Sequence, residues 1–287
     1  MLIRPLVWQR IVRVLLVLTA ALTLGVLVFI IAYILSQGLG VITPEFLTSA
    51  PERMGKEGGI LPQIVVTGVL ALLALVVAMP LGLGTAVYLA EYTRESVITR
   101  TIRFAADALA GVPSIIFGLF GFILFVIRLR MGWSIVAGGL TLALMVLPTI
   151  VRTSEEAIRS VPGALREVSL SLGATKGQTI WHVVLPNALP GILTGGILAV
   201  SRAAGEVAPI LFTGVAYYMA DLPKRLTDQF MDLGYHVFVL STQSPNIDQT
   251  RPILYATVIV LLALTFALNV TAVLIRARVR KRLRALG

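Results

Sequence analysis

Two oppositely charged side chains, Arg202 and Glu206, lie four residues apart in a strongly apolar stretch, "ILAVSRAAGEVAPILF". A charge at the centre of a bilayer costs about 3 kcal/mol on insertion scales, so such a residue normally has a partner, contacts water or serves a function. The planar guanidinium of Arg202 can bind two oxygens of an oxyanion, and Glu206 can hold it when no anion is bound. We therefore expect the pair to line a path for an anion. The simpler alternative is that the charges only neutralise each other so that the helix can insert.

A second group of spaced residues lies in the polar segment that precedes this stretch. Its members follow the pattern E-x5-G-x9-V-x-L-P and are Glu167, Gly173, Val183, Leu185 and Pro186. None of these side chains is a nucleophile or a metal-binding cluster, so the pattern indicates a shaped surface rather than a reaction centre.

Local signals predict short helices across this segment. A capping box at Thr153–Glu156 predicts one helix start, and Pro162, which a helix tolerates only in its first turn, predicts another. Gly173 supplies a helix stop, and Thr175–Gln178 repeats the capping pattern of a third short helix, which Leu185–Pro186 is expected to end. We therefore expect a hairpin of two short helices joined at Gly173.

One face of the helix after Pro162 is apolar. Val161, Leu165, Val168 and Leu172 recur at helical spacing. Such a stripe can dock on a partner protein, or it can lie on the chain's own bundle or on the bilayer surface. The pattern alone leaves both possibilities open.

Composition excludes several kinds of chemistry. The chain has no cysteine and only two histidines, His182 and His236, so it offers no disulfide, thiol nucleophile or zinc-cysteine site. Its one Gly-Lys pair, Gly55–Lys56, is followed by Glu57 rather than by Ser or Thr, so there is no Walker A sequence. We expect no catalytic residue, no metal site and no cofactor, and we place any ATP chemistry on another chain.

The remaining residues predict an all-α, polytopic membrane protein. Hydrophobic residues make up 57% of the chain and charged residues 13%, and the mean hydropathy is +0.92. A bilayer crossing needs about 20 apolar residues. We expect one transmembrane domain over 1–287, with a cytoplasmic loop at 153–187, a basic tail at 276–287 and six spans, at about 11–35, 64–90, 104–127, 135–151, 188–212 and 253–275.

The positive charges indicate the orientation of these spans. The net charge is +10, but Lys and Arg lie at the ends of the apolar blocks, so we expect no nucleic-acid binding. Of the 24 Lys and Arg residues, sixteen lie on one side of the predicted membrane and seven on the other, and Arg202 lies within a span. Basic residues favour the cytoplasmic side, so both termini and the 153–187 loop are expected there.

The spaced residues resemble the "EAA" cytoplasmic loop of ABC importer permeases, with Val168–Ser169 where the family usually has two alanines. In that family the loop couples the permease to a separate ATPase. The resemblance therefore assigns ATPase coupling to Glu167, Val168, Ser169, Gly173, Leu185 and Pro186.

Longer stretches narrow the resemblance. "GVPSIIFGLFG", "SRAAGEVAP" and the final span resemble phosphate-specific ABC importer permeases of the PstA type. The resemblance implies a type I permease fold in the inner membrane. It also implies inward phosphate transport with a PstC-type permease, a PstB-type ATPase and a periplasmic or extracellular PstS-type binding protein. An importer for phosphonate, sulfate or molybdate is the alternative, followed by an integral membrane enzyme or a channel.

Overall fold

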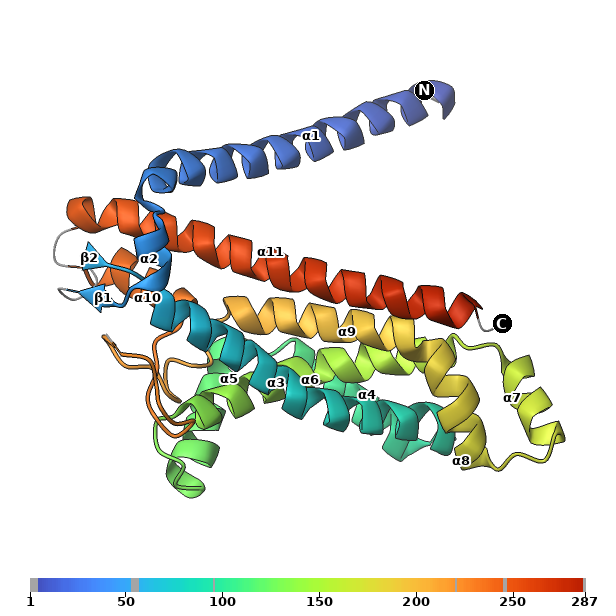
Figure 1. Cartoon of the computed structure of the whole chain (residues 1–287). Coiled ribbons are helices and arrows are strands. Elements are labelled where there is room, and N and C mark those ends of the chain that lie inside the picture. Colours follow the sequence, from blue (N-terminus) through green and yellow to red (C-terminus); the bar gives the residue numbers. More distant parts are fainter. Residues whose placement is uncertain (1–4, 53–56, 95, 220, 245–246, 286–287) are drawn as a thin grey trace.

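The chain is mostly helical in the computed structural model, which describes residues 5–52, 57–94, 96–219, 221–244 and 247–285 (Figure 1). Five helical runs in this part of the chain are long and apolar enough to cross a membrane, and a sixth is counted if one sharply bent helix pair forms a single span. The five long helices are α1 (Pro5–Gly38), α3 (Leu61–Val87), α6 (Ile135–Arg159), α9 (Leu185–Gly205) and α11 (Ile247–Ala285). This confirms the all-α membrane class.

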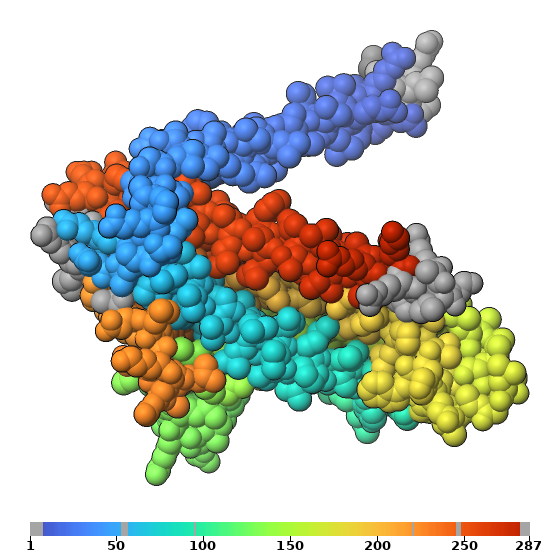
Figure 2. Space-filling view, viewed as in Figure 1, coloured from blue at the N-terminus to red at the C-terminus, as the bar shows by residue number. Residues whose placement is uncertain are grey.

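The core of the bundle lies between α3, α6 and α9. Leu70 and Ala74 of α3, Val146 of α6 and Ala199 of α9 are almost fully buried in one apolar cluster. Helix α11 packs along α9, and α1 contacts α11 near one end, where the ring of Tyr33 meets that of Tyr255 edge-on. Toward its beginning α1 diverges from the rest of the molecule (Figures 1 and 2).

Small residues let α6 and α9 approach closely. A Cβ atom added to Gly195 would lie 2.0 Å from Thr153 Oγ1, and one added to Gly191 would lie 2.5 Å from Ala157 Cβ. Only glycine fits at these points without a shift of the neighbouring helix. The face is therefore a helix-packing surface of the kind common in membrane bundles.

The third predicted span, 104–127, is not one continuous helix. It consists of α4 (Val97–Ala110), α5 (Ser114–Gly121) and the π-helical η4 (Phe122–Arg128), with α4 and the α5–η4 run bent by 103° relative to each other. The bend falls at Gly111–Pro113, where proline lacks an N–H donor and pushes the residue before it away from helical geometry. The predicted start at residue 104 was also late by seven residues.

The predicted helix start at the Thr153–Glu156 capping box is wrong. Helix α6 continues past the predicted end of the fourth span, at residue 151, to Arg159. Thr153 lies inside it and donates its hydroxyl hydrogen to Thr149 O. Ala157 and Ile158 are buried in a second apolar cluster, so packing extends the helix beyond the point that the local signal indicated.

The second half of the hairpin does not end at Leu185–Pro186 as predicted. Helix α8 (Lys176–Thr179), the π-helical turn η5 (Ile180–Val184) and α9 follow one another without a break. Leu185 donates its N–H to Ile180 O, five residues back, and Pro186, which has no N–H to donate, lies in the first turn of α9.

Helix α9 ends at Gly205, whereas the fifth span was predicted to reach residue 212. Glu206 is extended, with φ −87° and ψ 134°, and the next residues to about 216 are irregular. Pro209, three residues further on, cannot donate to a continuing helix.

The two ends of the bundle differ. At one end α7 (Gly163–Ser171) and α8 project, and α1 begins and α11 ends there (Figure 1); we call it the hairpin end. The other end carries short elements, which are η1 (Leu39–Val41), α2 (Pro44–Thr48), a two-stranded antiparallel sheet of β1 (Pro51–Glu52) and β2 (Glu57–Gly58), and α10 (Leu233–Thr242). Helix α3 ends at the hairpin end in the π-helical turn η3 (Tyr88–Tyr92).

Candidate functional site

The structure brings Arg202 and Glu206 together. Arg202 lies in the last turn of α9, and its Nε donates to Glu206 Oε1 at 3.3 Å. The exposed fraction of the side chain is 38% for Arg202 and 21% for Glu206, so the pair is partly open. Neither Nη group of Arg202 donates to another residue in the described part of the chain, which leaves the forked face of the guanidinium available to an oxyanion.

Polar side chains on α9 contact α11, one next to Arg202 and one about two turns before it. The Ser201 hydroxyl donates to Asn269 Oδ1, and Arg276 Nη1 donates to Thr194 Oγ1 at 2.9 Å. Asn269 lies well inside the apolar run of α11. Helix α9 therefore ends, and its cation is exposed, beside the apolar run of the neighbouring helix α11.

The irregular backbone after Glu206 is paired within the protein. Ser134 donates its N–H to Thr213 O, Phe230 to Gly214 O and Ala216 to Phe230 O. A Cβ on Gly118 of α5 would lie 2.9 Å from Ala208 O, so this segment also packs directly on α5. Non-helical backbone at membrane depth requires such internal pairing, and it is found where it is buried in protein or lines a cavity.

The hairpin forms as predicted on either side of Gly173. Helix α7 starts immediately after Pro162, Gly173 has a φ of +86°, and the Thr175–Gln178 capping box is complete. Several of its apolar side chains face outward, with Val168 59%, Leu172 83% and Trp181 71% exposed. These three residues and the exposed Glu167 lie on the hairpin, which projects at one end of the bundle (Figure 2).

The other predicted coupling residues lie elsewhere in the hairpin. The Ser169 hydroxyl is 2.9 Å from the hydroxyl of buried Thr179, which joins α7 to α8. Leu185 packs on the buried cluster at the base, and half-buried Pro186 follows it in α9. The predicted coupling residues therefore do not form one surface. Some are exposed, Ser169 makes a contact inside the hairpin, and Leu185 and Pro186 lie at its base.

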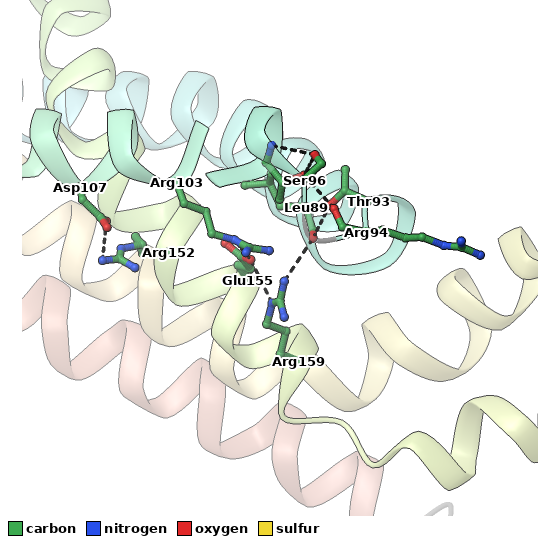
Figure 3. A network of polar contacts seen from close by, with 10 residues as sticks. Leu89, Thr93, Arg94, Ser96, Arg103, Asp107, Arg152, Glu155 and Arg159 are labelled. Atoms are coloured by element: carbon green, nitrogen blue, oxygen red, sulfur yellow. Dashed lines mark hydrogen bonds and ion pairs between the residues drawn. The ribbon is translucent and has the colours of Figure 1, made fainter. Parts of the chain in front are cut away.

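A network of ion pairs at the hairpin end was missed by the sequence reasoning. Glu155 of α6 is only 5% exposed and accepts from Arg103 Nε at 2.8 Å and from Arg159 Nε at 3.0 Å (Figure 3). Asp107 of α4 pairs with Arg152 of α6 in the same region. These contacts fasten α4 to the end of α6.

A second missed contact joins the hairpin to the end of α3. Arg166 of α7 donates to Glu91 of η3 through Nε at 3.0 Å and Nη2 at 2.7 Å. The visible signal was an acid at the end of an apolar span, but the partner is 75 residues away in the sequence.

A bundle of membrane-length helices, one of which ends at a charged pair, with an apolar hairpin at one end, suits a membrane-spanning transport subunit. The sequence profile of one family, the binding-protein-dependent transport system inner membrane component, matches residues 78–284. The chain belongs to this family.

Similarity to individual proteins supports this family assignment. A probable ABC transporter permease protein of Bacillus subtilis, YqgI, is 38% identical over 68% of this chain and 67% of its own length. The phosphate transport system permease protein PstA of Yersinia pestis is 36% identical over 77% of this chain and 75% of its own. The crystal structure of a bacterial ABC transporter involved in alginate import has a chain with a TM-score of 0.63 and 15% identity, covering 95% of this chain and 98% of that one, which shows the fold.

Family membership fixes the general role of the chain. It is a multi-pass inner-membrane subunit of an ABC importer, and it is not an enzyme, because a separate ATPase hydrolyses the ATP. Its partners in the transporter are that ATPase and a substrate-binding protein.

Proposed function

We propose that this chain is the permease subunit of an importer that carries inorganic phosphate inward. The observation that supports this most strongly is its similarity to proteins named as phosphate transport permeases, at 36% identity for the Yersinia pestis protein and 45% over 161 residues for PstA 1 of Mycobacterium tuberculosis strain H37Rv. The whole chain acts as one permease domain. It works with a PstC-type permease, a PstB-type ATPase and a PstS-type binding protein.

The hairpin is the docking site for the ATPase. Val168, Leu172 and Trp181 are exposed apolar side chains of the hairpin, and exposed apolar residues on a membrane protein's polar end fit a partner's groove. The excess of Lys and Arg in the segments of this end supports a cytoplasmic hairpin and cytoplasmic termini.

Arg202 is the phosphate contact in the path. Its two free Nη groups match two oxygens of a phosphate, and Glu206 holds the guanidinium between transport cycles. Because the pair lies where α9 ends at membrane depth, a phosphate that enters the bundle can displace Glu206 from Arg202.

Uptake of radiolabelled phosphate tests the proposal in cells that express the full set of subunits. Arg202→Gln is expected to reduce the uptake rate by about a hundredfold, because loss of a bidentate charged contact costs roughly 3 kcal/mol. Arg251→Gln, which removes an exposed arginine paired with Asp248 at the opposite end, is the matched control and should leave uptake unchanged.

Competition experiments identify the anion. Phosphate uptake should persist when sulfate or phosphonate is added at the same concentration. Equal competition by sulfate would overturn the phosphate assignment, and full uptake by Arg202→Gln with normal complex assembly would overturn the role of Arg202.

A further inference from the structure

The end of α3 holds the first helix of the hairpin through one arginine. Arg166 of α7 binds Glu91 of η3 with two donor groups, and the exposed fraction of the side chain is 22% for Arg166 and 9% for Glu91. The same guanidinium donates to Val161 O at 2.6 Å and to Ile158 O at 2.8 Å. Ile158 lies in the last turn of α6, where carbonyls need donors, and Val161 lies just beyond its end. One side chain thus joins α7, α3 and α6.

The next residue of η3 holds the second helix of the hairpin. Lys176, the first residue of α8, places its Nζ 4.9 Å from the centre of the Tyr92 ring, a cation–π contact. Within the hairpin, the Ser169 and Thr179 hydroxyls join α7 to α8. The hairpin is therefore fastened internally and is held by two consecutive residues, Glu91 and Tyr92.

Helix α3 continues from this contact to the core beside the charged pair. Its Leu70, Ala74 and Ala78 share one buried cluster with Ala199 and Ala203 of α9, the latter adjacent to Arg202. A displacement of the hairpin can thus reach the Arg202 region through packed side chains of α3. This route is separate from the covalent one, in which α8 continues through η5 into α9.

We propose that Arg166 and Glu91 form a latch that transmits movement of the hairpin to α3. Both are positioning residues: they touch neither phosphate nor ATP. The latch makes the hairpin and the end of α3 move as one body. It rests on the proposed docking of the ATPase at the hairpin, because that partner supplies the movement.

Coupling is measured as phosphate transported per ATP hydrolysed by the full complex in proteoliposomes. Arg166→Gln and Glu91→Gln should keep the ATPase bound and hydrolysis within about twofold, while transport per ATP falls by about tenfold or more. The double variant should fall no further than Arg166→Gln alone, because that variant already removes the ion pair with Glu91. Arg166→Lys, which keeps the charge but not the fork, should lose less than Arg166→Gln.

Arg152→Gln is the matched control, because its ion pair with Asp107 lies at the same end of the bundle without contacting the hairpin. Unchanged transport per ATP in both single variants would overturn the latch. A loss of transport and hydrolysis in proportion to the complex recovered would also overturn it, since that result indicates a role in folding alone.

A distance measurement decides the latch independently of substrate. The chain has no cysteine, so spin labels can be placed at Ser171→Cys on the hairpin and Tyr88→Cys on η3, which are both exposed. The distance distribution should be narrow in the otherwise unchanged chain and in Arg152→Gln, and broad in Arg166→Gln. Equal widths in all three would overturn the latch. If the distance distribution is narrow but the full complex transports no phosphate, the proposed function is refuted and the latch is still supported.

Discussion

Single exposed residues carry the proposed contact with the ATPase. Leu172 follows α7 directly and is 83% exposed, and no residue of α7 is buried. Burying a leucine side chain contributes about 1.5–3 kcal/mol, so Leu172 can supply a large part of a modest docking energy.

Leu172→Asp is therefore expected to reduce the ATPase that co-purifies with the permease by about tenfold or more. Leu226→Asp is the control, because Leu226 is also an exposed leucine but lies near the opposite end of the molecule. Quantitative co-purification from membranes checks the prediction. Normal recovery of the ATPase with Leu172→Asp would contradict the assignment of the docking surface.

Two buried titratable residues lie one helical turn apart at the start of α10, outside the long helices. Burial raises the pKa of Asp232 from 3.8 to about 6, against the lowering effect of N–H donors from Tyr235 and Gly234. Burial lowers the pKa of His236 from 6.5 to about 4. As the pH rises from about 4 to about 6, Asp232 destabilises the fold, since the unfolded chain ionises first. His236 has the opposite effect there, since the unfolded chain holds its proton longer.

Replacing Asp232 with Asn should leave His236 as the residue of this pair that makes stability depend on pH. Asn still caps α10 but carries no charge, so the variant should be more stable than the original chain at pH 7.5, by up to roughly 3 kcal/mol. Its melting temperature should then fall steadily between pH 6.5 and pH 4. Thermal unfolding in detergent, measured across this range for both proteins, tests the prediction. Parallel curves for the two proteins would show that Asp232 does not titrate in this window.

At the scale of helices, the contact between α6 and α9 sets how the charged pair is positioned. Gly195→Ala places a methyl group against Thr153 Oγ1, and forced overpacking of this kind costs about 1–3 kcal/mol. The variant should melt at a lower temperature and transport more slowly, because α9 must shift together with Arg202. Gly68→Ala is the control, since a Cβ there meets no atom within 4 Å. Equal melting temperatures for Gly195→Ala and Gly68→Ala would contradict the close contact.

The helices that sequence reasoning predicted best are those with strong local signals. Gly173 and the Thr175–Gln178 capping box act through neighbouring residues, so the hairpin could be predicted from the sequence. Helix ends that are decided by packing could not be predicted in this way. Thr153 has the same capping potential, yet the burial of Ala157 and Ile158 keeps it inside α6.

In the candidate site, too, local contacts could be predicted from the sequence and contacts between distant segments could not. The pairing of Arg202 with Glu206 was predictable because they lie four positions apart, about one helical turn. The pair of Arg166 and Glu91 was not, because only the fold brings η3 and α7 together. Gly111 and Pro113 permit a kink after α4, but the size of the bend, 103°, could not be predicted, since apolar composition is the same for a straight and a bent span.

At the scale of the whole molecule, the two ends of the bundle should lie on opposite sides of the membrane. The hairpin end carries α7, the beginning of α1 and the end of α11, and the other end carries the irregular segment around Thr227 (Figure 1). Because basic segments favour the cytoplasm, we expect the hairpin end there.

Single cysteines in this cysteine-free chain can test the orientation directly. Leu172→Cys should react with a membrane-impermeant maleimide in inverted vesicles and not in right-side-out vesicles, whereas Thr227→Cys should show the reverse. Both positions are exposed, so a lack of labelling reports the membrane barrier rather than burial. Exchange of the two results would invert the proposed topology and remove the hairpin from the ATPase. Labelling of both positions in the same vesicles would mean that the helices between them do not separate the two ends, which contradicts a bundle that crosses the membrane.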